Sequence, residues 1–152
     1  MNYLKRLKQS GEFEYSIGAN AEEIKHIEEE LGILLPEAYM DFLSECGSCN
    51  YGDVYINGIY KKKDSISYPV VELTKQLRED LHLSEDFIVL HYEVDEFLTL
   101  YKVSNKIRLK DAKVFEAEVY CNDKGDFEID KPTPIFDSFE EYFEDFLDLA
   151  ED

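Results

Sequence analysis

The sequence contains no tryptophan, and glycine, proline and cysteine are scarce, with seven, four and three copies among 152 residues. With so few glycines and prolines, the chain shows no low-complexity linker, no internal repeat and no obvious domain boundary. Three cysteines, an odd number, without an export signal fit reduced thiols better than a disulfide framework.

Long apolar runs are missing as well. No segment approaches the ~20 apolar residues that a membrane-spanning helix needs. The first residues, MNYLKRLKQSGEF, include basic side chains but lack the apolar stretch of a signal peptide. These absences predict a cytoplasmic protein without a membrane partner.

Basic residues are few, since sixteen Lys and Arg against thirty-five Asp and Glu give a net charge of −19. This charge repels the phosphates of nucleic acids and anionic membranes, and it attracts basic partners. The longest basic cluster, Lys61-Lys62-Lys63, fits a solvated turn or sheet edge better than a phosphate track. We therefore expect no nucleic-acid partner. Solubility alone can also explain an acidic surface, so a basic protein partner is one of two explanations for the charge.

The composition is sufficient for one folded domain. At 44% hydrophobic and 14% aromatic, the chain is too apolar to be disordered even though 34% of its residues are charged. A chain of this size buries roughly 68–70% of the surface that its unfolded form exposes. We expect a single domain over residues 1–152.

Two helices are predicted between residues 20 and 47. Asn20 and Glu23 have capping-box spacing, three apolar residues then recur on one helix face, and Gly32 supplies a left-handed stop. Pro36 suits the first turn of the second helix, which continues to Gly47. The apolar faces of the two helices consist of Ile24, Ile27 and Leu31, and of Tyr39, Phe42, Leu43 and Cys46.

The remaining pattern gives the fold class. Helical periodicity predicts further helices over residues 2–9, 70–82 and 139–150, and alternating or continuous apolar runs predict strands at 54–59, 87–90, 97–103, 114–120 and 127–129. We expect a turn near Asn57-Gly58, a hairpin across residues 93–96, a turn at residues 122–125 and an extended segment at Pro132 and Pro134. Helices lead, an antiparallel sheet follows and a helix closes the chain, which indicates an α+β fold.

Residues 24–43 have the spacing Ile-x-x-Ile-Glu-x-x-Leu-Gly-Ile-x-Leu-Pro-x-x-Tyr-x-x-Phe-Leu, and Gly47 and Gly52 follow. This pattern resembles the Smi1/Knr4 family, also called the SUKH superfamily. The resemblance implies one α+β domain, with N-terminal helices and a C-terminal helix packed around a central, mostly antiparallel sheet. Residues 137–143 resemble the short aromatic and acidic helix that closes these domains. A chance amphipathic helix pair would supply the apolar positions of the motif but not Glu28, Gly32, Leu35-Pro36 or Gly47. The matching residues are Glu28, Gly32, Leu35, Pro36, Tyr39, Phe42, Leu43, Gly47 and Gly52, together with Ile24 and Leu31.

No set of residues predicts catalysis, a cofactor or a metal site. Cys46 and Cys49 have the spacing of half a zinc site or of a redox pair, but a structural zinc site needs four ligands, and a metal or redox role for this pair stays open. Asp95 together with Asp111-Ala112-Lys113 superficially matches the acidic and lysine pattern of metal-dependent nuclease sites. The net negative charge disfavours this interpretation, because a nuclease needs a cationic surface for phosphate. The sequence lacks Gly-x-Ser-x-Gly, a Gly-rich phosphate loop and His-Glu-x-x-His, and its three histidines have no evident nucleophile partner.

Tyrosines beside carboxylates are the better functional candidates. Tyrosine rings fill pockets at protein interfaces, and carboxylates steer a basic partner. Each of these residues is also compatible with an ordinary solvated loop or strand position. The contact candidates are Asp53, Tyr55, Glu93, Asp95 and Glu96.

The resemblance implies a function without catalysis. Bacterial members of the family are largely associated with toxin systems, so we predict an immunity protein that binds a polymorphic toxin, such as a basic nuclease domain, and neutralises it by stoichiometric occlusion. The alternative is a regulatory protein-interaction module like the eukaryotic members, although long polar extensions expected of such scaffolds are not seen. An enzyme of unknown class is a third possibility. The toxin, the contact surface and the oligomeric state stay open.

Overall fold

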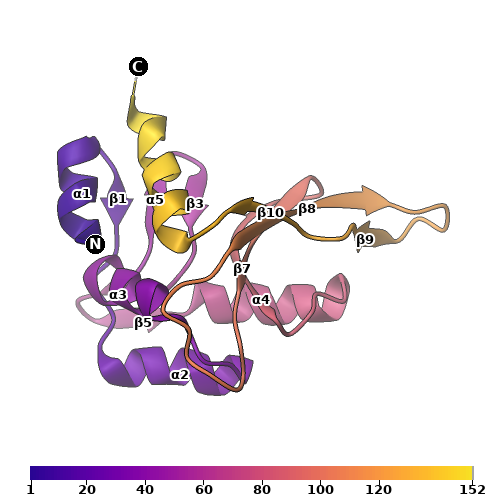
Figure 1. Ribbon diagram of the computed structural model, residues 1–152, viewed down its shortest axis with the longest axis horizontal. Coiled ribbons are helices and arrows are strands. Elements are labelled where there is room, and N and C mark those ends of the chain that lie inside the picture. Colours follow the sequence, from indigo (N-terminus) through magenta and orange to yellow (C-terminus); the bar gives the residue numbers. More distant parts are fainter. Residues whose placement is uncertain (152) are drawn as a thin grey trace.

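The computed structural model describes residues 1–151 of the chain and has the predicted α+β architecture (Figure 1). The helices are α1 (Tyr3–Ser10), α2 (Ala21–Leu31), α3 (Glu37–Cys46), α4 (Pro69–Asp80) and α5 (Phe139–Leu147), followed by a 3-10 turn, η1 (Asp148–Ala150). The strands are β1 (Glu14–Tyr15), β2 (Cys49–Tyr51), β3 (Val54–Ile56), β4 (Tyr60–Lys62), β5 (Ser65–Ser67), β6 (Phe87–Glu93), β7 (Phe97–Lys102), β8 (Val114–Cys121), β9 (Phe127–Ile129) and β10 (Thr133–Phe136). The predicted domain extends to residue 152, which lies outside the described residues.

The central sheet has the strand order β10-β8-β7-β6, and β9 pairs with the far half of β8. Every pair is antiparallel, which confirms the predicted sheet type. The hairpin predicted across residues 93–96 joins β6 to β7. A three-stranded sheet, β1-β2-β3, and the β4-β5 hairpin lie outside the central sheet.

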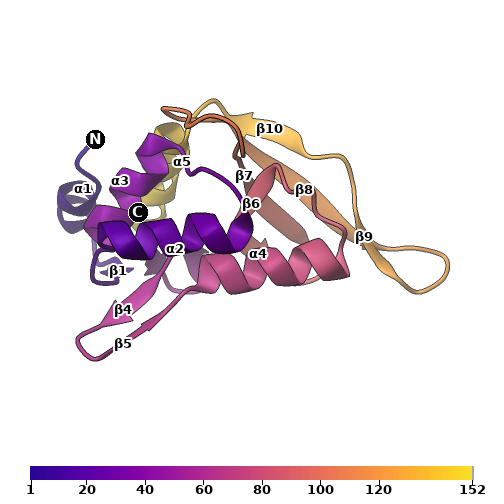
Figure 2. The ribbon, with the colours of Figure 1, turned by 90° about the horizontal axis from the view of Figure 1, so that it is seen from below.

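Helices pack on both faces of the central sheet. Helices α2 and α4 lie side by side (Figure 2), and α4 packs on β6 through a cluster that includes Leu77, Val89 and Leu98. On the other face, α3 and α5 contact each other, and Tyr39 and Phe139 both pack on Tyr101. None of the helices among residues 1–151 has the length and apolarity to cross a membrane.

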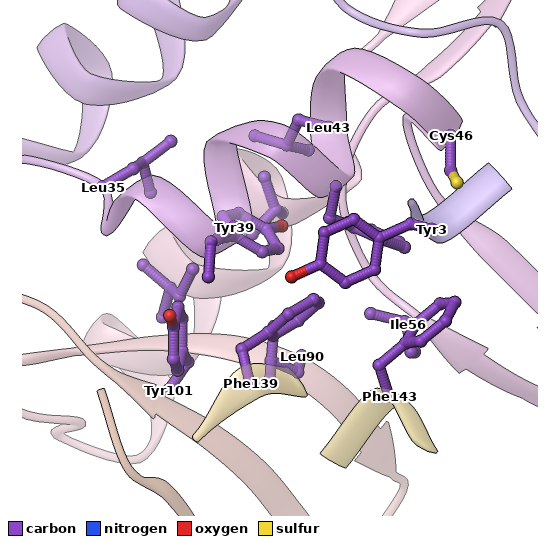
Figure 3. Close-up of a cluster of buried hydrophobic side chains, with 14 of the residues drawn as sticks. Tyr3, Leu35, Tyr39, Leu43, Cys46, Ile56, Leu90, Tyr101, Phe139 and Phe143 are labelled. Atoms are coloured by element: carbon purple, nitrogen blue, oxygen red, sulfur yellow. The ribbon is translucent and has the colours of Figure 1, made fainter. Parts of the chain in front are cut away.

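An aromatic cluster at the centre of this core joins the two ends of the chain (Figure 3). The Tyr3 ring makes edge contacts with Phe42 at 5.8 Å and Phe143 at 4.9 Å between centroids. Each such pair contributes roughly 0.5–1.5 kcal/mol beyond the burial of its apolar area. The β8-β9 hairpin instead projects from the opposite end of the molecule (Figures 1 and 2).

The helix ends at Asn20, Gly32 and Gly47 form as the sequence predicts, whereas Pro36 is the N-cap of α3 and not a residue of its first turn. The Glu23 backbone N–H donates to Asn20 Oδ1, the Asn20 N–H donates to Glu23 Oε1, both at 2.9 Å, and Gly32 is left-handed with φ 67°. Gly47 ends α3 with φ 74°, where a Cβ would lie 2.6 Å from the Ile17 carbonyl oxygen. That position therefore requires glycine for both its backbone angle and its close contact.

The turn predicted near Asn57-Gly58 is a bend and not a hairpin. The Asn57 backbone N–H donates to the Leu90 carbonyl at 2.8 Å, and its side-chain amide donates to the Val89 carbonyl at 3.1 Å. These bonds direct the chain toward β6, and the hairpin turns lie instead at residues 52–53 and 63–64. The extended segment at Pro132 and Pro134 includes a strand, β10, because it pairs with β8. Strands β1, β2, β4 and β5 are two or three residues long and carry no clear pattern in the sequence.

Glu28, the motif residue with no evident packing role in the sequence, connects three parts of the fold. Its Oε2 accepts the Leu35 N–H at 2.7 Å and a proton of Arg108 Nη1 at 2.6 Å. Arg108 also donates to the Leu35 carbonyl at 2.9 Å. The Glu28 carboxylate therefore fixes the α2–α3 connector to a segment 80 residues away in the sequence.

We expect Glu28→Ala to lower the free energy of unfolding by about 2 kcal/mol, because it leaves the buried Leu35 N–H without an acceptor. Glu28→Gln keeps an acceptor oxygen and should cost less. The measurement is urea unfolding followed by circular dichroism. Glu29→Ala is the matched control. Glu29 is exposed, and its ion pair with Lys25, at 3.7 Å, is a surface pair that contributes little to stability. This substitution should change the free energy of unfolding by less than about 0.5 kcal/mol. Equal losses for Glu28→Ala and Glu29→Ala would contradict this role of Glu28.

Candidate partner-binding surface

The five predicted contact residues lie on two hairpins and do not form one site. Asp53 is in the β2-β3 turn and Tyr55 is in β3, whereas Glu93 ends β6, and Asp95 and Glu96 are in the β6-β7 turn. The fold brings Tyr55 and Glu93 together around His91. Asp53 lines a hollow beside Tyr55, and Asp95 lines a different one next to α4.

Tyr55 has a structural role that the alternation of β3 does not reveal. Its hydroxyl accepts the Tyr92 backbone N–H at 3.1 Å and donates to the Tyr92 carbonyl at 3.3 Å. Burial raises the pKa of Tyr55, so the hydroxyl stays protonated and able to donate. Tyr55 therefore closes part of the free edge of β6.

Other side chains close the rest of this edge. Thr74 Oγ1 accepts the Val89 N–H at 3.1 Å, while Asn57 occupies the carbonyls of Val89 and Leu90. Backbone groups that are already paired cannot template another strand. A partner therefore cannot extend the central sheet at β6 without first displacing these side chains.

His91 lies under this edge and is 5% exposed. Its Nε2 is 3.1 Å from Glu93 Oε2, and its ring packs 4.4 Å from the Tyr55 ring. A hollow of about 190 Å³ separates it from Tyr142 and Phe146 of α5. Within residues 1–151, Glu93 is the side chain that hydrogen-bonds to His91, so no nucleophile is paired with the imidazole. The geometry is that of a buried aromatic and histidine packing site.

The residues that suggested metal or nuclease chemistry have structural positions. Cys46 and Cys49 are buried, and burial raises the pKa of Cys46 to about 12 and raises that of Cys49 as well. Asp111 Oδ1 accepts the Tyr101 hydroxyl at 2.7 Å and the Phe139 N–H at 2.8 Å, which anchors the start of α5. In the part of the chain that is described, no group of three or more His, Cys, Asp and Glu side chains is placed to hold a metal ion.

A hollow of about 670 Å³ was not predicted from the sequence, apart from Asp95 in its lining. It lies between the second half of α4, the β6-β7 turn and the β8-β9 hairpin. These three segments come from separate elements of the fold, and the packing of α4 against the sheet brings them together. The signal in the sequence that points to it is an apolar residue in or just after each of two predicted turns, Val94 and Phe127, and both are exposed in the structure.

The residues of the sequence motif form the scaffold and not the surface. Tyr39 is fully buried, and its hydroxyl donates to the Asn57 carbonyl at 2.6 Å. Leu35, Phe42 and Leu43 are buried to the same degree. Pro36 is the N-cap of α3, and Gly52 has φ 60° in the β2-β3 turn.

A comparison with known protein families supports the assignment of these residues to a family motif. The profile of a family described as "SMI1-KNR4 cell-wall" (SUKH_5) matches residues 2–148, which is nearly the whole chain. No curated protein matches the sequence.

We expect Tyr55→Phe to lower the free energy of unfolding by about 1 kcal/mol, because the Tyr92 N–H and carbonyl lose their partner. Tyr60→Phe is the matched control, since Tyr60 is exposed and a phenyl ring keeps its contact with Lys62. Both variants are compared by chemical unfolding. If Tyr55→Phe is no less stable than Tyr60→Phe, the hydroxyl does not cap the β6 edge.

We expect Cys121, which is exposed, to react with iodoacetamide in the native protein, and Cys46 and Cys49 to react only after denaturation. Their raised pKa values and burial keep these two thiols protonated and shielded. Mass spectrometry of digests over time is the measurement, and Cys121→Ser should remove all rapid labelling. Rapid native labelling of Cys46 or Cys49 would revive the redox interpretation.

Proposed function

Because the chain belongs to the SMI1-KNR4 family of SUKH domains, we propose that it is a cytoplasmic immunity protein that neutralises a cognate polymorphic toxin. It acts by stoichiometric occlusion, without catalysis. The partner is a basic protein domain, and a nuclease domain is the leading candidate. Association of bacterial family members with toxin systems supports this role.

The net charge of −19 is the observation that carries the proposal. If each of the sixteen Lys and Arg side chains paired with a carboxylate, nineteen acidic side chains would still have no cation. A surface of that kind attracts a protein that binds phosphate and can cover its cationic active site in place of the nucleic acid. The charge thus supports both the choice of partner and the mechanism of inhibition.

The positions of the reactive side chains favour binding over catalysis. The Cys46 and Cys49 thiols are buried, the Asp111 carboxylate anchors α5, and His91 is enclosed by aromatic rings. Catalytic groups need access to a substrate as well as a suitable partner. These groups serve packing and local hydrogen bonding in the fold.

A regulatory interaction module is the second candidate, and the family description, "SMI1-KNR4 cell-wall", favours it. The two candidates differ in the partner. An immunity protein rescues cells from a toxin, whereas a regulatory module has no effect on toxicity and binds a component of a signalling pathway.

The test is co-expression with the candidate cognate toxin domain, which is to be sought in the neighbouring gene. Co-expression should restore growth and yield a one-to-one complex on a sizing column. A toxin domain from a non-cognate system is the control and should stay toxic. Absence of both rescue and complex would defeat the proposal for that pair.

The electrostatic part of the proposal has its own measurement. The association rate with a catalytically inactive toxin domain should fall steeply as salt rises, because surface charges are screened within about 8 Å at physiological ionic strength. The dissociation rate should change much less. An association rate that does not depend on salt would show that charge does not steer the encounter.

A further inference from the structure

The hollow next to α4 is a groove with apolar walls and an acidic rim, which we name the acidic groove. Leu77 of α4 and Leu81, the residue that follows α4, form its floor together with Tyr92 of β6. Val94 of the β6-β7 turn and Phe127 of the β8-β9 hairpin form its walls. Figures 1 and 2 show the hairpin projecting beyond the sheet on the side where α4 ends.

Both wall residues expose apolar surface. Val94 is 67% exposed, the highest value among the large hydrophobic residues of 1–151, and Phe127 is 44% exposed. Exposed apolar surface around a concave site is typical of a binding groove. The volume of about 670 Å³ is sufficient for several side chains of a partner segment.

Hydrogen bonds to backbone N–H groups hold both walls in place. In the β6-β7 turn, the Glu96 N–H donates to the Glu93 carbonyl at 2.9 Å, and the Glu96 carbonyl accepts the Val119 N–H at 2.8 Å. At the hairpin tip, Asn122 Oδ1 accepts the N–H groups of Lys124 and Asp126 at 2.9 and 3.0 Å. A site held in this way loses little conformational entropy when a partner binds.

The charge of the rim selects the kind of partner. Four carboxylates line the groove, no Lys or Arg does, and no side chain of the described residues forms an ion pair with any of the four. This arrangement repels nucleic acids and small anions, and a second copy of the chain carries the same net charge of −19. An apolar side chain flanked by Lys or Arg matches both the walls and the rim. The four carboxylates are those of Asp80, Asp95, Asp126 and Glu128.

We propose that the acidic groove is the docking site for a basic, amphipathic segment of the toxin domain. Apolar side chains of that segment insert between Val94 and Phe127, and its cationic side chains pair with the rim. The inference rests on the proposed function for the identity of the partner. It adds the contact surface, in which Asp95 is the one predicted contact residue that takes part.

The experiment measures binding of the inactive toxin domain to two pairs of variants. Val94→Ser with Phe127→Ser should raise Kd about tenfold or more, mainly through faster dissociation. Asp80→Lys with Asp126→Lys should slow association and weaken its salt dependence. All four side chains are exposed, and unchanged thermal unfolding of the variants confirms that the fold is intact.

Two control pairs change exposed residues outside the groove. Ile17→Ser with Ile107→Ser, at positions that are 51% and 61% exposed, is the control for the apolar pair. Glu12→Lys with Asp64→Lys, both at exposed positions, replaces two carboxylates by two cations as the charge pair does and is the control for it. Each control should change Kd by less than about twofold.

The outcomes distinguish failure of the proposed docking site from failure of the proposed function. If the toxin domain binds the wild-type protein and both groove pairs equally well, the groove is not the docking site and the proposed function stands. Equal losses in the controls would also overturn the groove, since the attraction would then be diffuse.

If the toxin domain does not bind the wild-type protein, the proposed function fails, and a peptide of alternating Lys and Leu becomes the probe. Nuclear magnetic resonance shifts confined to Leu77, Val94 and Phe127, and absent with a Glu-for-Lys peptide, would support the groove. Scattered shifts or none would overturn it.

Discussion

Packing of Tyr3 between α3 and α5 is the contact on which the rest of the arrangement depends, because it joins the first helix of the chain to the last. The Arg6–Glu144 ion pair links the same two helices at the surface. Asp111 fixes the start of α5 from a loop next to the sheet, so the aromatic cluster and the sheet form one core. With both ends of the chain tied into this half of the molecule, the β8-β9 hairpin is left to project from the other half (Figure 1).

Scaffold and surface are separated in this protein. The motif residues are buried, end helices or form turns, and Glu28 connects the α2–α3 connector to Arg108. Their substitution therefore affects stability first. The edge of β6 is closed by Tyr55, Asn57 and Thr74, which leaves the side chains on turns and in grooves as the surface that is open to a partner. Such positions can vary without loss of the core, which suits a fold that serves different partners.

The excess of carboxylates has a cost as well as a use. With a net charge of −19, the carboxylates repel one another in the folded protein, and this repulsion lowers its stability. Packing of the aromatic core offsets the loss. At the acidic groove, four carboxylates without a cation partner surround exposed apolar walls. A basic partner would relieve the repulsion and cover the walls at once, so charge and shape favour the same class of protein there.

The sequence by itself determined the elements whose bonds are local. The capping box of Asn20 and Glu23, the left-handed Gly32 and the hairpin across residues 93–96 each depend on residues a few positions apart, so their patterns are legible in the chain. Only the tertiary structure decided that Asn57 hydrogen-bonds to the edge of β6 and does not form a hairpin turn. It also decided that Arg108 is the partner of Glu28. It also placed Asp80 and Asp126 on one groove. These choices depend on packing between segments distant in sequence, and no local periodicity encodes which distant groups will meet.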